Sequence, residues 1–364
     1  MIVFWFELSV LLAGFAAAVL LFWRVPDLPR AKTNASIKVS VIIPARNEAK
    51  TLPLLLADLK AQSFPPHEII VVNDASEDDT EAVARSFGVR VISPGDKPEN
   101  WVGKCWACQA GAKAAAGDSF VFLDADVRLS PDGLRRIAGA HAAHGTISVQ
   151  PWHTTQRCYE SCALVFNLVH IGAIGSALPR PVNFGMFGPV IAISRADYAA
   201  IGGHETVKTA VVEDMALAGI LRGANIPFRV FVGDADVAYR MYPGGFAELW
   251  LGFVKNLATG AAKTPVWLFL LVTLFLASLA SAALHLAISL FTGHSLVWLY
   301  GTCYLLWVAA LSVLGRRIGR FHPLAFVFYP APLSVFLAVF LQSLAIRLFR
   351  GKVKWKGRAI ELER

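Results

Sequence analysis

Two aspartates separated by one residue, Asp124 and Asp126, are the side chains best suited to chemistry on a phosphorylated substrate. A nucleotide diphosphate carries several negative charges, and a divalent cation that bridges its phosphates needs oxygen ligands from the protein. One carboxylate can reach the metal while the other reaches the ribose or a metal-bound water. Solvated turns also use Asp freely, so the motif alone is weak evidence. We expect Asp124 and Asp126 to bind a divalent cation.

A second acidic pair, Glu213 and Asp214, stands at the start of a helical pattern. Transfer of a sugar to a hydroxyl group needs a general base that removes the hydroxyl proton, and a carboxylate can do this. The alternative is structural, because acidic residues in the first turn stabilise the positive end of a helix. The pair is the best candidate for the base, with the structural role as the alternative.

Two further residues have both a binding and a structural interpretation. Asp74 can accept hydrogen bonds from a nucleotide base or ribose, or it can cap the helix that follows it. Lys104 can offset phosphate charge at the start of its helix, or it can be an ordinary surface lysine. Both are therefore candidate ligands for the ribose and phosphates of a nucleotide, with the structural roles as the alternatives. The glycine-containing segments 185–189 and 202–204 predict flexible loops that a substrate can approach closely.

Segments with the apolar spacing of strands alternate with segments that have the spacing of helices between residues 39 and 123. The expected strands are Val39–Ile43, Glu68–Asn73, Val89–Ser93 and Ser119–Leu123, and the expected helices are Lys50–Gln62, Asp79–Phe87 and Cys105–Ala116. This alternation predicts an α/β fold with a mostly parallel sheet covered by helices on both faces.

Polar clusters follow three of these strands at their carboxyl ends. Pro44–Glu48 follows the first strand, Asn73–Asp74 the second, and Asp124–Asp126 the fourth. Ligands bind beyond the carboxyl ends of the strands in such sheets. We therefore expect the three clusters to converge on one edge of the sheet, which is a stronger signal than any single motif.

Hydrophobic residues make up 55% of the 364 residues, which is too apolar for an ordinary soluble enzyme. Four stretches are long enough to cross a membrane: Met1–Trp23, Val266–Phe291, Leu296–Leu314 and Pro323–Leu348. A signal peptide is the alternative for the first stretch, which lacks a preceding basic region. The segment Tyr242–Thr259 has its large apolar residues on one helical side and predicts a helix at the membrane interface.

We therefore expect five parts in chain order. They are a transmembrane helix at 1–23, a catalytic α/β domain at 33–245, an interfacial amphipathic helix at 246–262, membrane helices at 266–348 and a basic tail at 349–364. Basic residues cluster beside the apolar stretches, as they do on the cytosolic side of membrane proteins. This predicts a multi-pass protein of the cell membrane with a cytoplasmic catalytic domain. The net charge of +8 comes without an aromatic-interleaved basic motif, so no nucleic-acid partner is expected.

The expected topology contains a conflict. Four full crossings would place the basic tail on the side opposite the α/β domain, against the positive-inside rule. The last stretch contains Pro330 and Pro332, which interrupt a helix. We expect this stretch to be kinked or re-entrant, so that the tail returns to the cytosol.

The chain has five cysteines, an odd number whose spacing indicates no extracellular disulfide framework. Cys105 with Cys108, and Cys158 with Cys162, are spaced so that four thiolates could hold a zinc ion. Ordinary packing within helices is the favoured alternative.

The order of the motifs resembles the family 2 glycosyltransferases with a GT-A fold. The stretches that carry the resemblance are Val41–Glu48, Val72–Ser76, Asp124–Asp126 and Glu213–Asp214. The resemblance implies a Rossmann-like sheet in which Pro44, Arg46 and Glu48 of the first loop hold the nucleotide with Asp74. It also implies that the D-x-D motif binds nucleotide and Mg²⁺ or Mn²⁺, and that Asp214 is the catalytic base. A single in-line displacement then inverts the anomeric centre, with a UDP-sugar as the expected donor.

The chain is more closely similar to the membrane-bound glycosyltransferases of carotenoid and hopanoid pathways, of the 4,4'-diaponeurosporenoate glycosyltransferase type. The stretches that carry this similarity are Trp101–Ala107, Gly202–Glu205, Met241–Tyr242, Phe253–Leu257 and Trp355–Arg358. No Q-x-x-R-W motif follows Glu213–Asp214, in contrast to the processive polysaccharide synthases, which favours transfer of one sugar. The similarity implies a lipid acceptor, such as a carotenoid acid, a hopanoid or another polyisoprenoid. The alternatives are a polyprenyl-phosphate sugar transferase and a catalytically inactive membrane scaffold.

Overall fold

The computed structural model describes residues 2–30, 37–349, 352–355 and 357–361. These residues form two compact units. The α/β unit comprises Pro26–His153, Gly185–Met241 and Arg350–Arg364, and the helical unit comprises Met1–Val25, Thr154–Phe184 and Tyr242–Phe349. The segment Thr154–Phe184, which the sequence analysis includes in the α/β domain, is thus grouped with the apolar helices.

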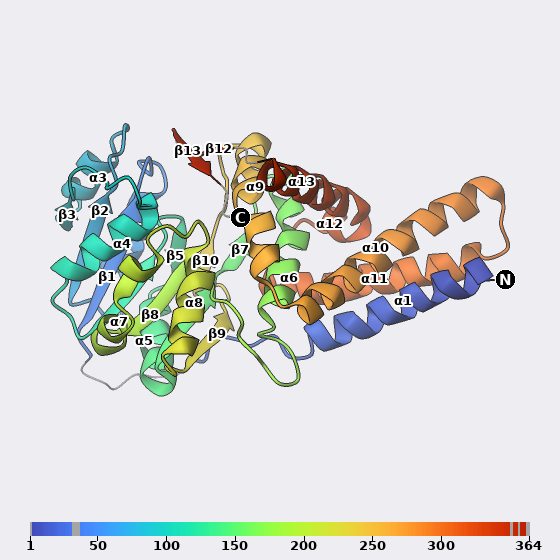
Figure 1. The fold of residues 1–364 in the computed structure, drawn as a ribbon, viewed down its shortest axis with the longest axis horizontal. Coiled ribbons are helices and arrows are strands. Elements are labelled where there is room, and N and C mark those ends of the chain that lie inside the picture. Colours follow the sequence, from blue (N-terminus) through green and yellow to red (C-terminus); the bar gives the residue numbers. More distant parts are fainter. Residues whose placement is uncertain (1, 31–36, 350–351, 356, 362–364) are drawn as a thin grey trace. The chain divides into compact units, whose positions relative to one another are not determined.

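A seven-stranded sheet with the order β3-β2-β1-β4-β8-β6-β9 forms the centre of the α/β unit (Figure 1). Its strands are β1 (Val39–Ala45), β2 (Glu68–Asn73), β3 (Arg90–Ile92), β4 (Ser119–Leu123), β6 (Thr146–Gln150), β8 (Val190–Ser194) and β9 (Phe228–Val232). Strand β8 runs antiparallel to β4 and β6, and the other neighbouring strands are parallel. The prediction of a mostly parallel sheet is confirmed.

A smaller sheet stabilises the turn after β4. Strand β10 (Val237–Tyr239) pairs antiparallel with β5 (Val127–Leu129) and parallel with β7 (Trp152–Thr154). Strand β5 begins directly after the Asp124–Asp126 motif, and the Val127 N–H donates to the Asp124 carbonyl at 3.1 Å. The small sheet therefore holds the far side of the tight turn that carries both aspartates.

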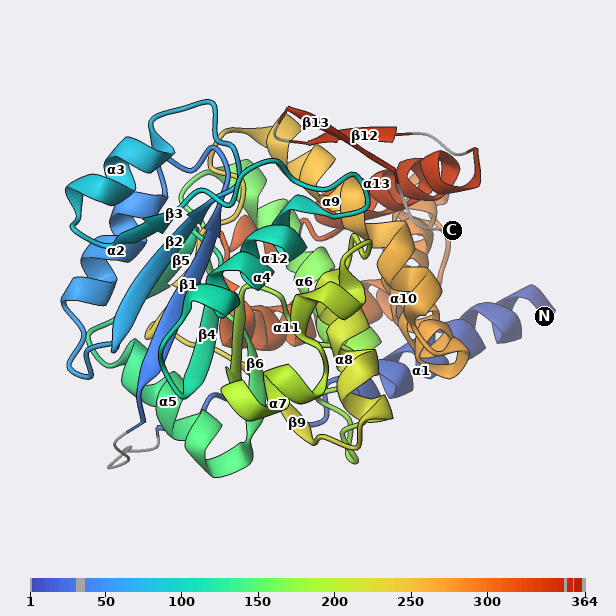
Figure 2. The ribbon, with the colours of Figure 1, turned by 60° about the vertical axis from the view of Figure 1, so that its left-hand side comes forward.

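Helices cover both faces of the large sheet (Figure 2). They are α2 (Leu52–Lys60), α3 (Thr80–Ser86), α4 (Gly103–Ala114), α5 (Gly133–His144), α7 (Arg195–Ala200) and α8 (Glu213–Gly223), with a 3₁₀ turn η2 (Gly203–Val207). All seven elements that the spacing predicts between residues 39 and 123 are present. Their ends differ by no more than two residues from the expected ones.

The two faces of the sheet pack differently. Leucines of α2, such as Leu55 and Leu59, join Val41 and Ile43 in one buried apolar cluster, which excludes water from that face. On the other face α4 comes very close to the strands. A Cβ atom at Gly111 would lie 2.5 Å from the Ile42 Cγ2 atom, so this approach requires glycine.

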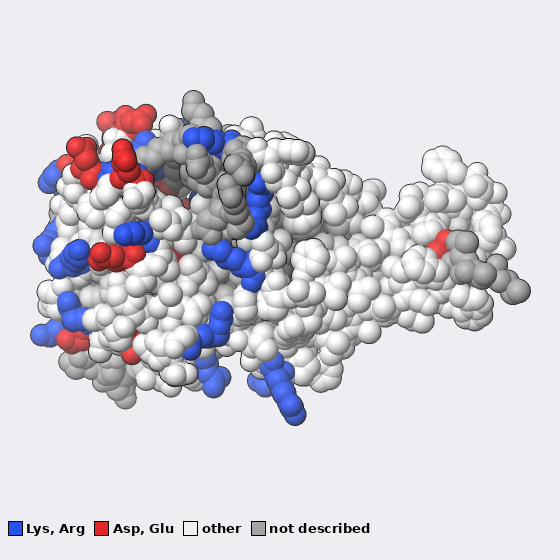
Figure 3. Space-filling view, in the orientation of Figure 1, with Lys and Arg blue, Asp and Glu red and all other residues white. Residues whose placement is uncertain are grey.

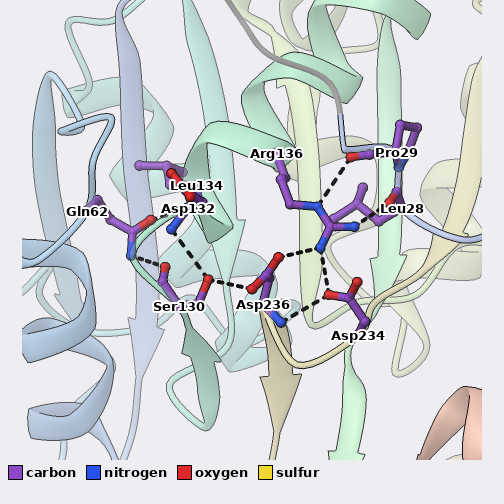
Figure 4. Close-up of polar contacts among 9 residues, drawn as sticks. All are labelled: Leu28, Pro29, Gln62, Ser130, Asp132, Leu134, Arg136, Asp234 and Asp236. Carbon is purple, nitrogen blue, oxygen red and sulfur yellow. Dashed lines mark hydrogen bonds and ion pairs between the residues drawn. The ribbon is translucent and has the colours of Figure 1, made fainter.

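A buried arginine joins the first residues of the α/β unit to the loop between residues 232 and 237 (Figure 4). Arg136 of α5 forms ion pairs of 2.6 Å with Asp234 and Asp236, and its side chain is only 6% exposed. It also donates to the backbone carbonyls of Leu28 and Pro29. The segment that follows the first apolar helix is therefore attached to this unit by charge-assisted hydrogen bonds.

The helical unit contains α1 (Ile2–Leu21), a 3₁₀ turn η1 (Cys158–Cys162), α6 (Ala163–Ile174), α9 (Phe246–Lys263), α10 (Val266–Thr292), α11 (Val297–Ile318), α12 (Leu324–Val327) and α13 (Pro330–Leu348), with a two-residue strand β11 (Gly319–Arg320). Four of these helices, α1, α10, α11 and α13, are long and apolar enough to cross a membrane. On the face drawn in Figure 3, charged side chains gather over the α/β unit, whereas α1, α10 and α11 present almost only uncharged residues.

Small and polar residues join the apolar helices. A Cβ atom at Gly14 of α1 would lie 2.1 Å from the Ser278 Cβ atom of α10, so the two backbones approach closely. Near the start of α1, Glu7 pairs with His285 of α10 at 2.9 Å and accepts a hydrogen bond from the Tyr300 hydroxyl of α11. An acidic side chain in an apolar helix thus has partners on both neighbouring helices.

Helix α9 packs against α13. The Trp250 indole N–H donates to Gln342 at 2.6 Å, and the Ser343 hydroxyl donates to the Val254 carbonyl at 2.6 Å. Arg347 donates to the Ala258 carbonyl at 2.9 Å. Three polar residues in the second half of α13 are therefore bonded to α9, the helix that the sequence places at the membrane interface.

Candidate active site

The loops after β1 and β2 are joined at the carboxyl edge of the sheet, as predicted. The Asp74 N–H donates to the Ala45 carbonyl at 2.9 Å. The Arg46 guanidinium donates to the Asp74 carbonyl at 2.9 Å and forms an ion pair of 2.8 Å with Glu77. Arg46 is thus a structural link between the two loops as well as a candidate ligand for a nucleotide.

The first loop is shaped by an asparagine in a left-handed conformation. Asn47 has a φ of +54°, its N–H donates to the Ser76 hydroxyl, and its side-chain oxygen accepts from the Glu77 N–H at 2.8 Å. The Glu48 N–H donates to the Thr80 hydroxyl at 2.8 Å. Pro44 lies within β1 itself, opposite Val72 in the register. The backbone of the loop is therefore fixed before any ligand binds.

Asp74 does not cap helix α3. The residue before that helix is Asp79, and Asp78 accepts from the Thr80 N–H at 3.1 Å. Asp74 is buried, at the point where β2 ends. The capping interpretation is therefore wrong, and a role in binding remains open to Asp74.

A lysine lies between carboxylates from two different elements. The Lys104 ammonium, in the first turn of α4, is 2.8 Å from Asp124 Oδ1 and 2.8 Å from Glu213 Oε1. Burial acts to lower the pKa of Lys104, but the charges of Asp124 and Glu213 outweigh it and hold that pKa well above its ordinary value. The Lys104 side chain is 30% exposed, and its ammonium connects the D-x-D motif to the second acidic pair.

Asp214 lies at the start of α8, and its carboxylate accepts hydrogen bonds from two backbone N–H groups. The Gly188 N–H donates to Asp214 Oδ2 at 2.9 Å, and the Met215 N–H donates to Oδ1 at 2.8 Å. Burial, and secondly the charge of Glu213, raise the pKa of Asp214 to about 7, against the opposing effect of Lys104. A carboxyl group with a pKa near neutral is suited to accept and release a proton at physiological pH.

Gly188 is the residue whose importance the sequence does not reveal. Loop 185–189 is predicted only as flexible, yet a Cβ atom at Gly188 would lie 3.1 Å from both Asp214 Oδ2 and Lys104 Nζ. The Asp124 N–H also donates to the carbonyl of the next residue, Pro189, at 2.9 Å. The loop therefore connects the end of β4 to Asp214, and its glycines were the only signal in the sequence.

The two carboxylates of the D-x-D motif can supply part of the ligand set of a divalent cation. Asp124 and Asp126 offer the hard oxygen donors that Mg²⁺ and Mn²⁺ prefer. Within the described part of the chain, no group of three or more His, Cys, Asp or Glu side chains could hold a metal ion. A cation bound here would need further oxygen ligands, and the phosphates of a nucleotide are of that kind.

The cysteines do not form the zinc site considered as an alternative. Cys105 and Cys108 are buried in α4, where burial raises the pKa of both thiols. Zinc binds the thiolate form, which this environment disfavours. Cys105 donates to the Val207 carbonyl at 3.4 Å, as an ordinary packed side chain.

Fold and site together are those of a glycosyltransferase with a GT-A fold. Residues 40–163 match the sequence profile of glycosyl transferase family 2. The chain is 34% identical over 358 residues to the 4,4'-diaponeurosporenoate glycosyltransferases of Staphylococcus aureus strains MRSA252 and USA300, covering 96% of this chain and 95% of theirs. The chain therefore belongs to glycosyltransferase family 2 and is a glycosyltransferase.

A solved structure has a similar fold over nearly the whole chain. It is the mannosyltransferase PcManGT from Pyrobaculum calidifontis in complex with GDP-Man and Mn²⁺, with a TM-score of 0.57 and 17% sequence identity. The similarity covers 93% of this chain and 97% of that one. The predicted GT-A fold with apolar helices at both ends is confirmed.

Proposed function

We propose that this protein transfers one sugar from a nucleotide-sugar to a membrane lipid, with a carotenoid acid as the first candidate acceptor and hopanoids or other polyisoprenoids as the next. The observation that carries the proposal is the position of Lys104, whose ammonium lies 2.8 Å from Asp124 and 2.8 Å from Glu213, the residue before Asp214. The near full-length similarity to enzymes named for a carotenoid acid supports this acceptor class.

The donor is held from two sides in this proposal. Pro44, Arg46, Glu48 and Asp74 line the nucleotide, on a loop pair that the structure fixes in advance. Asp124 and Asp126 hold Mg²⁺ or Mn²⁺, which supplies positive charge to the leaving diphosphate when bound. Lys104 adds a second positive charge close to the same carboxylates. We expect a UDP-sugar as donor.

Transfer inverts the anomeric carbon in one displacement. An acceptor oxygen forms a bond to that carbon while the bond to the diphosphate breaks, and the nucleoside diphosphate leaves with the electron pair. Where the acceptor is a hydroxyl, Asp214 takes its proton, with Glu213 beside it. Where the acceptor is a carboxylic acid, the attacking oxygen is ionised at neutral pH and has no proton to lose.

The membrane supplies the acceptor in this proposal. Four apolar helices support a multi-pass protein of the cell membrane, with the α/β unit on the cytoplasmic side where nucleotide-sugars are made. The absence of a Q-x-x-R-W motif supports the addition of a single sugar rather than a polymer.

The decisive experiment supplies the purified chain with UDP-glucose, Mn²⁺ and a panel of lipids, and identifies products by mass spectrometry. We expect one hexose on a carotenoid acid or a related polyisoprenoid, and more than a hundredfold loss in Asp126→Asn. With a hydroxyl acceptor we expect a loss of the same size in Asp214→Asn, because only that acceptor has a proton to lose. Transfer at the wild-type rate by Asp126→Asn, or by Asp214→Asn with a hydroxyl acceptor, would refute the assigned role. A product on a polyprenyl phosphate would replace the carotenoid acceptor. Failure to bind any nucleotide, with or without metal, would indicate an inactive scaffold.

A further inference from the structure

The C-terminal segment folds as a two-stranded hairpin. Strands β12 (Lys352–Trp355) and β13 (Arg358–Glu361) pair antiparallel, and Gly357 stands between them with a φ of +80°. We call these two strands and Gly357 the C-terminal hairpin. It belongs to the α/β unit, although the helix before it in the chain, α13, belongs to the helical unit. From the sequence this stretch is predicted only as a basic tail beside the membrane.

The turn of the hairpin lies against the loops after β1 and β2. A Cβ atom at Gly357 would be 3.5 Å from Glu77 Oε1 and 3.6 Å from Arg46 Nη2, which is ordinary van der Waals contact. The same Arg46 side chain donates to the Asp74 carbonyl at 2.9 Å. Residues more than 270 positions apart in the sequence therefore meet at the loop pair to which we assign the nucleotide.

We propose that the C-terminal hairpin is part of the donor site and contributes to binding of the nucleoside diphosphate; this rests on the proposed function of that loop pair. Its position beside Arg46 and Glu77 places the hairpin at the edge of the nucleotide site. Its sequence contains Lys352, Lys354 and Arg358, and a diphosphate is the ligand whose charge is complementary to such a segment.

The same placement resolves the topology conflict in the sequence. The chain leaves the α/β unit at Met241 and re-enters it at Arg350, so the number of membrane crossings between these residues is even. Three helices in this interval are candidates, namely α10, α11 and α13. Helices α10 and α11 follow each other directly and form a pair of opposite crossings. An even number requires one of the three not to cross, and we infer that it is α13, whose Gln342 and Ser343 form hydrogen bonds with α9.

The test measures nucleotide affinity in the full chain, purified in nanodiscs of uncharged lipid. Titration calorimetry with UDP, and separately with GDP, in the presence of Mn²⁺ compares the wild type with a chain that ends after Phe349. We expect the truncation to weaken binding of the preferred nucleotide roughly tenfold or more. An unchanged affinity would refute the proposal. If truncation instead reduced only the association with vesicles that contain anionic lipid, the tail would be a membrane contact and the proposal would be wrong.

A point substitution guards against misfolding of the truncated chain. Gly357→Ala forces a side chain onto a left-handed backbone that contacts Arg46 and Glu77. Gly88→Ala is the matched control, because Gly88 has a similar φ of +66° and nothing within 4 Å of its Cβ position. We expect roughly threefold or greater weakening of nucleotide binding for Gly357→Ala alone. Equal affinities for the two variants would count against the hairpin.

Two further outcomes separate this inference from the function on which it rests. If the wild type bound neither nucleotide, the proposed function itself would fall, and with it the hairpin's role. If the wild type bound nucleotide and a C-terminal tag were on the opposite side of the membrane from the α/β unit, as judged by protease protection in oriented vesicles, only the hairpin proposal would fall. We expect tag and α/β unit on the same side.

Discussion

The backbone N–H of Gly188 donates a hydrogen bond of 2.9 Å to Oδ2 of Asp214, at a position where a Cβ atom would lie only 3.1 Å from the same oxygen. The bond orients a buried carboxylate whose pKa is raised to about 7, chiefly by burial. The same loop accepts from the Asp124 N–H through Pro189. One short segment thus positions both the candidate base and the candidate metal ligand.

Substitution of Gly188 by alanine should impair transfer without unfolding the protein. The added Cβ atom would lie 3.1 Å from Asp214 Oδ2 and from Lys104 Nζ, so both groups must move by a few tenths of an ångström. We expect kcat to fall roughly tenfold to a hundredfold, because catalysis depends steeply on the position of the reacting groups. Gly219→Ala, in the same helix as Asp214 but with no contact closer than 4.0 Å, is the control. Equal kcat values for the two variants would contradict the positioning role.

The pH dependence should reveal which kind of acceptor the enzyme uses. With a hydroxyl acceptor Asp214 must be ionised, so kcat/KM should rise with pH through about 7. Glu213→Gln removes a charge that raises the pKa of Asp214, so the rise should move to lower pH. With a carboxylic acid acceptor no proton is removed, and the rise should be absent. Profiles of kcat/KM from pH 5 to 9 with both acceptor types would distinguish the two cases. If Glu213→Gln left the rise at the same pH, the charge of Glu213 would not raise the pKa of Asp214.

Removal of the Lys104 ammonium should alter metal binding even without substrate. Lys104 neutralises Asp124 Oδ1 at 2.8 Å, so it competes with a cation for that carboxylate. We expect Lys104→Met to bind Mn²⁺ more tightly than the wild type when no nucleotide is present, by roughly threefold to tenfold, and to bind UDP more weakly. Electron paramagnetic resonance of free Mn²⁺ measures the first effect. Lys113 is exposed in the last turn of the same helix, so Lys113→Met should change neither the Mn²⁺ affinity nor the UDP affinity. Weaker Mn²⁺ binding by Lys104→Met than by the wild type would show that Lys104 does not compete with the cation.

The parallel part of the sheet could be predicted from the sequence because local patterns determine it. The β-branched residues of Val39–Ile43 and Glu68–Asn73, and the leucine spacing of Lys50–Gln62, predict elements that the structure contains. Convergence of the D-x-D motif with Asp74 follows from parallel strands alone. The rest depends on contacts between distant segments. No local pattern pairs Lys104 with Glu213, brings Gly188 to Asp214 or takes Gly357 to Arg46, since each joins residues more than 20 positions apart.

The buried side chain of Arg136 should matter for stability and not for chemistry. Its ion pairs with Asp234 and Asp236 and its hydrogen bonds to the carbonyls of Leu28 and Pro29 hold the entry segment onto the sheet. Arg136→Met would leave the carbonyl groups of Leu28 and Pro29 without this donor. Since both aspartates are more than a third exposed, we expect a loss of about 2 kcal/mol rather than the larger cost of a fully buried pair.

The neighbouring residue provides the control for that substitution. Arg135 is 39% exposed and has only an ion pair of 3.8 Å with Asp132, so Arg135→Met should change the unfolding free energy by less than about 0.5 kcal/mol. Thermal unfolding of both variants in the same detergent measures the difference, which should appear as a Tm several degrees lower for Arg136→Met alone. Nucleotide affinity below the transition should stay at the wild-type value in both. Equal Tm values would mean that the entry segment is held by its backbone hydrogen bonds to β9, such as that from the Leu28 N–H to the Val232 carbonyl at 2.8 Å.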